Sequence, residues 1–475
     1  MTPDQRRVTF ALCVIVGLTL LVAAGLTFLI SPMAEGLGLG DDVVEDSLVV
    51  PAVASLIVVF IAGRLGDRFG QRRTIVAASA CFTLGSLVLA AAQNTATVEL
   101  GLALCGIGAV VIQVVAVSLL QQTTPEGPAR VSAFTSYGAV FPLAFLVLPV
   151  VTAGALGHIS WRWIPVGWAI AGVVMAVLGQ ALLTSRPRPL SPGDMVTPVL
   201  AGLALAAIAS VLGEVDNAEV EAHKLVIGIL VFLVASGLCY LLVRRSSSPG
   251  FSLRPLRLPM LMALLLAVMV VSLVQILSYV CIVLEYFYGL TALQASLVIL
   301  PAQVGAIVGA KVVASFAVRR WGVARAGRGL VLANGITMLP LVLMTPSTPV
   351  WFLVAVSTVF SCAGMGALTV LNIDVMGRAP ADSTGAVSAF RIAASTVGTA
   401  LGMTLVGAII LSSVQVDAGD QNVALAQLEQ MSFALRVSGV LCFVVALGAW
   451  ALLVTSERRK RPRAGMLGGT PTLAP

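Results

Sequence analysis

Long apolar runs, separated by short charged breaks, dominate this sequence and limit what it can fold into. Hydrophobic residues make up 59% of the 475 residues, and charged residues make up only 10%. A soluble domain carries about 25% charged residues, so this chain is not a conventional water-soluble globule. Most runs hold about 20 residues, enough for a helix to cross a hydrocarbon core of about 30 Å. The pattern predicts an all-α polytopic membrane protein.

The runs and their breaks predict fourteen transmembrane helices. An even number of spans places the two ends of the chain on the same side of the membrane. The predicted spans lie near residues 8–31, 46–63, 74–92, 98–121, 131–156, 161–184, 195–213, 223–243, 258–284, 292–316, 328–345, 350–372, 385–412 and 432–455.

Charge sorts to the two sides of this arrangement. With a cytoplasmic N-terminus, the inner side receives most arginines, including Arg6, Arg7, Arg391 and the cluster Arg458–Arg463, while acids such as Asp41 and Glu45 fall outside. Membrane proteins keep Lys and Arg on the cytoplasmic side. The net charge of +7 is therefore a topology signal rather than a sign of nucleic-acid binding. We expect an integral plasma-membrane protein with both termini in the cytoplasm.

Enzymatic chemistry has no support in the sequence. The seven cysteines all lie in predicted spans at no metal-type spacing, so neither a disulfide framework nor a metal site is expected. The sequence has no phosphate-cradling loop and no catalytic triad, and we expect no cofactor. The apolar run at residues 8–30 is too long for the core of a signal peptide, so it is assigned as the first span.

One connection differs from the rest. Between spans 2 and 3, residues 63–74 read Gly-Arg-Leu-Gly-Asp-Arg-Phe-Gly-Gln-Arg-Arg-Thr and hold five charges. Gly63 and Gly70 permit a tight chain path and a close approach of helices. Asp67 can accept hydrogen bonds from the N-terminus of a neighbouring helix, where the helix dipole favours an anion. A weaker copy of the motif follows span 10 at residues 315–322, with Arg319 in the place of Asp67.

The motif at residues 63–74 resembles the loop signature of the major facilitator superfamily of transporters. Three further segments resemble its fourteen-span drug:proton antiporter branch: Ser160–Ile164 in span 6, Leu300-Pro301 in span 10 and Val397–Gly402 in span 13. This resemblance implies two six-helix bundles, with spans 7 and 8 as two extra helices between them. The implied parts are an N-terminal bundle at 1–190, the extra helices and linker at 191–250, a C-terminal bundle at 251–457 and a disordered tail at 458–475.

The resemblance also implies a role for the charged loop. In the family this loop latches the two halves together when the cytoplasmic side is closed, and the latch breaks when that side opens. For Arg72 and Arg73, fixing the topology explains the charge equally well. The implied latch residues are Gly63, Asp67, Arg68, Gly70, Arg72 and Arg73.

Lys311 lies inside predicted span 10, eight residues before Arg319 and so about 12 Å from the inner boundary. A lysine at the middle of a membrane helix costs about 2.5–3.5 kcal/mol, and such residues usually face a cavity or a partner. We hypothesise that Lys311 lines the transport path and binds an anionic group or takes part in proton movement. Gln303 lies two turns back on roughly the same side. The alternative is a side chain that extends inward to the membrane surface.

Span 9 has a polar face of residues at helical spacing. In the family, the spans equivalent to 1, 4, 9 and 12 line the central cavity. The alternative is hydrogen bonding between helices, worth about 0.6 kcal/mol on average. The remaining wall is apolar, which suits a hydrophobic or amphipathic solute. The candidate pathway residues are Ser272, Gln275 and Tyr279 in span 9, Gln113 in span 4, and Ser361, Asn372 and the edge acid Asp374 in and after span 12.

Three functions remain open at this point. The first is secondary active export of drugs or secondary metabolites by alternating access, with proton coupling through Lys311 or Asp374. Leu18–Ile30 holds no acid, whereas the family often has one in span 1, so this coupling would be unconventional. The second function is movement of a lipid or lipid-linked compound, and the third is a non-transporting scaffold or sensor. The sequence sets neither the substrate nor the oligomeric state.

Overall fold

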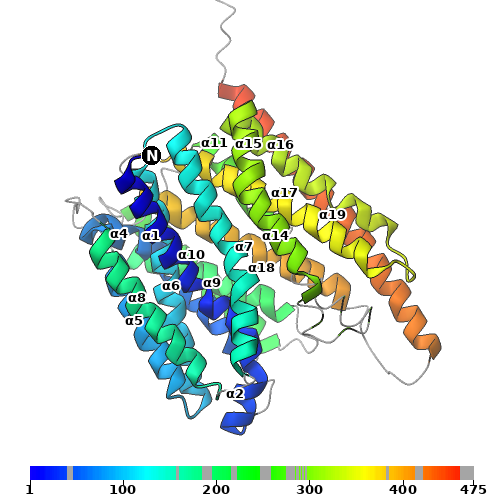
Figure 1. Ribbon diagram of the computed structural model, residues 1–475, viewed down its shortest axis with the longest axis horizontal. Coiled ribbons are helices and arrows are strands. Elements are labelled where there is room, and N and C mark those ends of the chain that lie inside the picture. The colour runs from blue at the N-terminus through cyan, green and yellow to red at the C-terminus, as the bar shows by residue number, and fades with distance from the viewer. Residues whose placement is uncertain are drawn as a thin grey trace, which may run out of the picture.

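The computed structural model describes residues 1–39, 47–156, 160–183, 195–215, 222–245, 258–273, 284, 288, 290, 294, 297–380, 384–411 and 421–460. Within these residues the regular secondary structure is helical, which confirms the all-α prediction. Helices from the first part of the chain (blue to teal) gather on one side of Figure 1, and those from the last part (yellow to red) gather on the other. The N-terminus and the end of the last helix lie at the same, upper side.

The ends of the helices in the first group follow from their sequences. Thr2 and Gln5 form a capping box at the start of α1, and Asn94 caps α6 in the same way with Thr97. Gly70 alone joins α4 to α5 with φ of +87°, in the region that favours glycine. The first group consists of α1 (Pro3–Gly25), η1 (Leu26–Leu29), α2 (Ile30–Leu37), η2 (Ser47–Val49), α4 (Val50–Phe69), α5 (Gln71–Ala90), α6 (Thr95–Thr123), α7 (Pro128–Leu156) and α8 (Trp163–Leu182).

The second group repeats the same connection. Gly322 alone joins α15 to α16 with φ of +75°, so the internal repeat seen in the sequence returns as a repeated geometry. The second group consists of α11 (Pro259–Leu273), α14 (Leu300–Val308), the π-helical turn η4 (Gly309–Val313), α15 (Ala314–Trp321), α16 (Val323–Ile336), η5 (Leu339–Leu343), α17 (Val350–Gly377), α18 (Thr384–Leu411) and α19 (Gln421–Lys460).

Two helices lie between the groups in the sequence, at the places of predicted spans 7 and 8. The first, α9 (Val196–Val215), packs against α4 of the first group and against α18 of the second. A Cβ atom on Gly202 would lie 2.1 Å from the carbonyl oxygen of Ile57, so α9 and α4 touch through their backbones. The second, α10 (Ala222–Arg245), packs on α9 and exposes large apolar side chains such as Leu230 and Leu233, as expected of a lipid-facing helix.

Eleven helices in the described residues are long and apolar enough to cross a membrane. Two shorter apolar helices, Val196–Val211 and Pro259–Leu273, coincide with predicted spans 7 and 9. The total of fourteen spans stays a prediction, and so do the boundaries of the predicted domains. Helix α19 runs to Lys460, and residues 461–475 of the predicted tail lie outside the described residues.

Small residues bring the helices of the second group into backbone contact. A Cβ atom on Gly398 would lie 2.1 Å from the carbonyl oxygen of Met269, which joins α18 to α11. A Cβ atom on Gly309 would lie 1.9 Å from the carbonyl oxygen of Cys362, which joins η4 to α17. Such close approaches are typical of small residues at the interfaces of membrane helices.

We call the end of the molecule that carries the N-terminus, the loops at Gly70 and Gly322, and Glu457 the basic end. The buried apolar side chains of the described residues form two clusters. The larger one runs from the first group into α15, α16 and α17 at the basic end, where it includes Ala317 and Met376. The smaller one lies at the opposite end and belongs to the second group alone. The two groups therefore share a core at the basic end.

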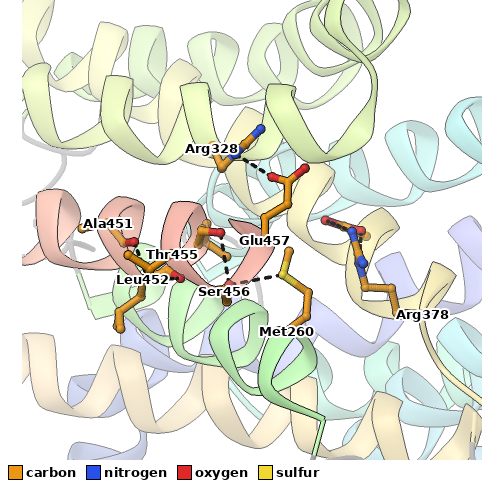
Figure 2. A network of polar contacts seen from close by, with 10 residues as sticks. Met260, Arg328, Arg378, Ala451, Leu452, Thr455, Ser456 and Glu457 are labelled. Atoms are coloured by element: carbon orange, nitrogen blue, oxygen red, sulfur yellow. Dashed lines mark hydrogen bonds and ion pairs between the residues drawn. The ribbon is translucent and has the colours of Figure 1, made fainter. Parts of the chain in front are cut away.

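Polar contacts fix the end of α19 in the second group (Figure 2). Glu457 pairs with Arg328 of α16 at 2.5 Å, and Ser456 Oγ donates to Sδ of Met260 on α11 at 3.3 Å. The neighbouring Thr455 instead donates to the carbonyl oxygen of Ala451, one turn earlier in α19. Three helices of the second group are thus tied together at the basic end.

Candidate functional site

The two groups of helices meet along two seams at the basic end. The first, which we call the latch seam, lies between Gly63 and Asp67 of α4 and Gly385 of α18. A Cβ atom on Gly63 would lie 2.4 Å from the carbonyl oxygen of Gly385, so the two helices touch through their backbones. A Cβ atom on Gly385 would lie 2.6 Å from Asp67 Oδ2. The carboxylate of Asp67 therefore lies against the first turn of α18, where the helix dipole favours a negative charge.

Neutral hydrogen bonds continue the latch seam from α6 to α18. Ser118 Oγ and Gln122 Nε2 both donate to Thr384 Oγ1, at 3.3 and 3.1 Å. Ser388 Oγ donates to the carbonyl oxygen of Val114 at 2.8 Å. Sequence reasoning missed these residues, because nothing local marks a Ser or Thr whose partner lies more than 250 positions away. Backbone contacts, the Asp67 carboxylate and these neutral hydrogen bonds together make up the latch seam.

The contacts given below for the other predicted latch residues lie within the first group. Gly70 makes the tight turn into α5. Arg72 Nε donates to Gln180 Oε1 of α8 at 3.3 Å, within the first group. The guanidinium of Arg68 lies 5.3 Å from the ring centre of its neighbour Phe69, and Arg73 is exposed. Of the predicted set, Gly63 and Asp67 form the seam itself.

The second seam, which we call the lysine seam, lies between Lys311 of η4 and Ser136 of α7. Lys311 Nζ donates a hydrogen bond to Ser136 Oγ. Lys311 is the central residue of the π-helical turn Gly309–Val313, and such turns occur frequently at functional sites. Ser136 lies eight residues into α7, about 12 Å along it, which matches the expected depth of Lys311.

A cavity of about 520 Å³ lies beside the lysine seam, between the basic ends of α1 and α7. Ser136 forms part of its wall and so joins the cavity to Lys311. The cavity is lined by Met1, Arg6, Thr9, Phe10, Cys13, Pro128, Ala129, Ser132 and Ser136.

A buried arginine lies between the two seams. Arg391 of α18 is only 6% exposed, and its Nη1 donates to Asn372 Oδ1 of α17 at 3.2 Å. The guanidinium also lies beside the hydroxyl of Tyr137 on α7, but that oxygen and Arg391 Nε are buried without hydrogen-bond geometry to any described group. Sequence reasoning counted Arg391 as an inner-side topology charge; the structure corrects this, because Arg391 is buried at the contact of the two groups. Its place seven residues inside α18 was the available signal.

Other predicted pathway residues have partners inside one group. Ser272 and Ser395 join α11 to α18 through hydroxyls 2.9 Å apart, and Gln113 Nε2 donates to Thr19 of α1 at 3.3 Å. These contacts match the alternative of hydrogen bonding between helices.

Asp374 pairs with Arg378 one turn on, with Oδ1 at 2.6 Å from Nε. Arg378 is labelled on the right side of Figure 2. Ser361 is buried and Gln303 is half-buried. Gln275 and Tyr279 lie outside the described residues. No group of His, Cys, Asp and Glu in the described part of the chain could hold a metal ion.

A match to a protein-family model assigns the chain to a family. The model described as Major Facilitator Superfamily matches residues 12–403. The chain belongs to the major facilitator superfamily. It is therefore a membrane transporter by family and not an enzyme, as the loop motif predicted.

Members of the superfamily with similar sequences include transporters of drugs. The chain is 26% identical over 360 residues to the uncharacterized MFS-type transporter EfpA of Mycobacterium tuberculosis strain H37Rv, covering 74% of this chain and 67% of EfpA. It is 24% identical over 365 residues to the multidrug efflux pump LfrA of Mycolicibacterium smegmatis, covering 75% and 72%. It is 26% identical over 426 residues to the puromycin resistance protein pur8 of Streptomyces alboniger, covering 86% and 82%.

Solved structures of the superfamily share the fold. The human organic anion transporter MFSD10 matches with a TM-score of 0.66 at 14% identity, covering 95% of this chain and 100% of that chain. The proton:xylose symporter XylE matches with a TM-score of 0.63 at 13% identity, covering 95% of each. At such identities the likeness concerns the major facilitator fold alone.

Proposed function

We propose that the protein exports hydrophobic or amphipathic compounds, drugs or secondary metabolites, by alternating access. The proposal rests chiefly on the latch seam, where Gly63 and Asp67 of α4 lie against Gly385 of α18. The relatives LfrA and pur8, an efflux pump and a resistance protein by name, support export of small molecules. The apolar walls of the helices suit such solutes.

Alternating access is supported by the way the two groups meet. At the basic end they share a hydrophobic core, a backbone contact and hydrogen bonds between α6 and α18. The smaller core at the opposite end belongs to the second group alone. A molecule whose two groups share a core and hydrogen bonds at one end has the form expected for one of two alternating states. The closed end is then the cytoplasmic one, with both termini in the cytoplasm and the protein in the plasma membrane.

Coupling to protons is part of the proposal. A proton-driven exporter needs a group that changes its charge between the two states, and a carboxylate at the seam serves this purpose. Asp67 lies at the latch seam itself, so its protonation would weaken the attraction to the first turn of α18 and favour opening. Asp374 is paired with Arg378 on its own helix, which makes it the weaker candidate.

The test is transport in proteoliposomes with an imposed pH gradient. Ethidium, puromycin and a fluorescent phospholipid serve as solutes for the wild type, Asp67→Asn and the matched control Asp4→Asn at the exposed start of α1. We expect gradient-driven movement of at least one of the two drugs, a loss of at least tenfold in Asp67→Asn, and normal rates in Asp4→Asn. Transport of the phospholipid alone would replace the proposal by lipid transport. No transport of any of the three solutes would favour a non-transporting scaffold.

A further inference from the structure

We propose that the cavity between α1 and α7 binds an amphipathic anion: a drug-sized apolar molecule with one carboxylate, which Lys311 and Arg6 hold. This inference rests on the proposed function only in that the bound anion would then be an exported substrate. Binding itself is a separate property and can be measured without transport.

The cavity has the size and lining of a small-molecule site. Its volume of about 520 Å³ lies within the range of about 300–1,000 Å³ that drug-sized ligands occupy. Phe10, Cys13, Pro128 and Ala129 give it apolar walls, and the hydroxyl groups of neighbouring residues give it a few polar points. An apolar body with a single polar group matches this combination.

The charges around the cavity are positive. Arg6 is the charged side chain among its lining residues, and Lys311 reaches its wall at Ser136. Among the described residues no Asp or Glu lines the cavity, and Asp4 and Glu126, each two residues from a lining residue, are exposed. An anion is therefore favoured over a cation of the same shape.

Lys311 would interact more favourably with an anion than with its present partner, Ser136. In the described residues its ammonium group bonds a neutral hydroxyl, and a lysine at this depth gains more from an anion than from a neutral group. Ser136 lies on the cavity wall, so a carboxylate placed there meets both the hydroxyl and the ammonium group. Tyr137, which follows Ser136 in α7, is buried and interacts with buried Arg391, a second cation. The positive charge thus extends from the cavity towards the seam of the two groups.

The alternative is that Lys311 only extends towards the membrane surface and uses Ser136 as a convenient contact. The two explanations differ in one measurable way. A lysine that only avoids lipid contributes nothing to the affinity for an added ligand, whereas a lysine that holds a carboxylate contributes to the affinity for the acid and not for its ester.

The experiment measures equilibrium binding to the purified full chain in nanodiscs of zwitterionic lipid. The probes are 11-(dansylamino)undecanoic acid and its uncharged methyl ester. We expect the acid to bind at least tenfold more tightly than the ester. Lys311→Met should weaken acid binding by about tenfold or more without changing ester binding, Lys311→Arg should retain most of it, and Arg6→Gln should weaken it by a few-fold.

Two variants serve as matched controls. Arg7→Gln makes the same change one residue on, at a side chain that does not line the cavity, and Lys224→Met makes it at the far end of α10. Both should bind the acid as the wild type does. Equal binding of acid and ester, or unchanged acid binding in Lys311→Met, would overturn the inference. Thermal unfolding of each variant separates a lost contact from a lost fold.

Transport with the same protein separates this inference from the proposed function. Anion binding without export of any solute would keep the binding site and reject the exporter. Export of ethidium without preferential anion binding would keep the exporter and reject the anion site. Competition between the acid and an exported drug would show that the anion site and the export pathway overlap.

Discussion

The two copies of the helix–glycine–helix connection are alike in path and unlike in partner. Gly70 and Gly322 each make the whole link between two helices, with φ of +87° and +75°. In the first copy, Asp67 lies against the first turn of α18 across the latch seam. In the second copy, Arg319 takes its place and is exposed. The repeat therefore preserves a turn, while only one copy carries an acid at a helix N-terminus of the other group.

The latch seam and the lysine seam also differ in the kind of contact that joins the two groups. The latch seam brings backbones together at Gly63 and Gly385 and adds neutral hydrogen bonds. The lysine seam places a long cationic side chain across the gap, with a cavity of about 520 Å³ beside it. A close, glycine-lined contact closes a path, and a long polar contact next to a cavity leaves room for a solute. We infer that the first seam serves closure and the second serves binding.

The largest effect should follow from fixing the latch seam covalently. Ser118 Oγ and Thr384 Oγ1 lie 3.3 Å apart, so cysteines at both positions can reach the S–S distance of about 2.05 Å with a small shift. We expect the Ser118→Cys, Thr384→Cys double variant to form a disulfide under oxidation and to lose transport completely, with recovery on reduction. The single variants are the controls. Full transport by the oxidised protein would show that this seam need not open.

Next in size is the replacement of a seam glycine. In Gly385→Ala the new methyl group meets Gly63 O at 2.5 Å and Asp67 Oδ2 at 2.6 Å, so the helices must separate. We expect at least a tenfold loss of transport and a lower unfolding temperature. The matched control is Gly329→Ala in α16, which meets nothing within 4 Å and should be neutral or stabilising by up to about 1 kcal/mol. Equal behaviour of the two variants would contradict the close contact.

Removing the buried arginine between the seams tests whether it serves function rather than stability. Arg391→Met deletes a desolvated cation whose recorded partner is the neutral Asn372, so the unfolding temperature should not fall. Transport should fall by about tenfold, as expected if the charge acts on the transport path. Arg378→Met is the contrasting variant, because it leaves Asp374 without its ion pair and should destabilise by about 1 kcal/mol or more. A destabilised Arg391→Met protein would assign Arg391 to structure.

The smallest effect should come from making the second copy resemble the first. Arg319→Asp places an acid at the exposed position of the repeat, where we expect transport within about twofold of the wild type and stability within about 0.5 kcal/mol. The reverse change, Asp67→Arg, puts a cation at the positive end of α18 and should abolish transport. The transport rates and unfolding temperatures of the Arg319→Asp and Asp67→Arg variants test these expectations. A strong effect of Arg319→Asp would mean that the two copies act as equals.

The sequence predicted those features that local chemistry determines. Apolar runs located the helices, and the glycines and acid of residues 63–74 anticipated a close approach and a helix N-terminus, which the structure supplies in α18. Lys311 could be singled out by its charge within an apolar run. Its partner Ser136 could not, because the pairing of α7 with η4 arises from packing between segments 175 positions apart. No sequence pattern indicated the π-helical turn. Arg391 was not singled out because the topology already accounted for the inner-side arginines.

The position of α9 has a consequence for how solutes can reach the interior. This helix packs on α4 and α18 together, so it covers the latch seam on its outer side, and α10 lies over it towards the lipid. The lysine seam has no such cover among the described helices. The two added helices thus lie on one side of the described structure, and in the proposed exporter they would close the lateral route from the bilayer beside the latch seam.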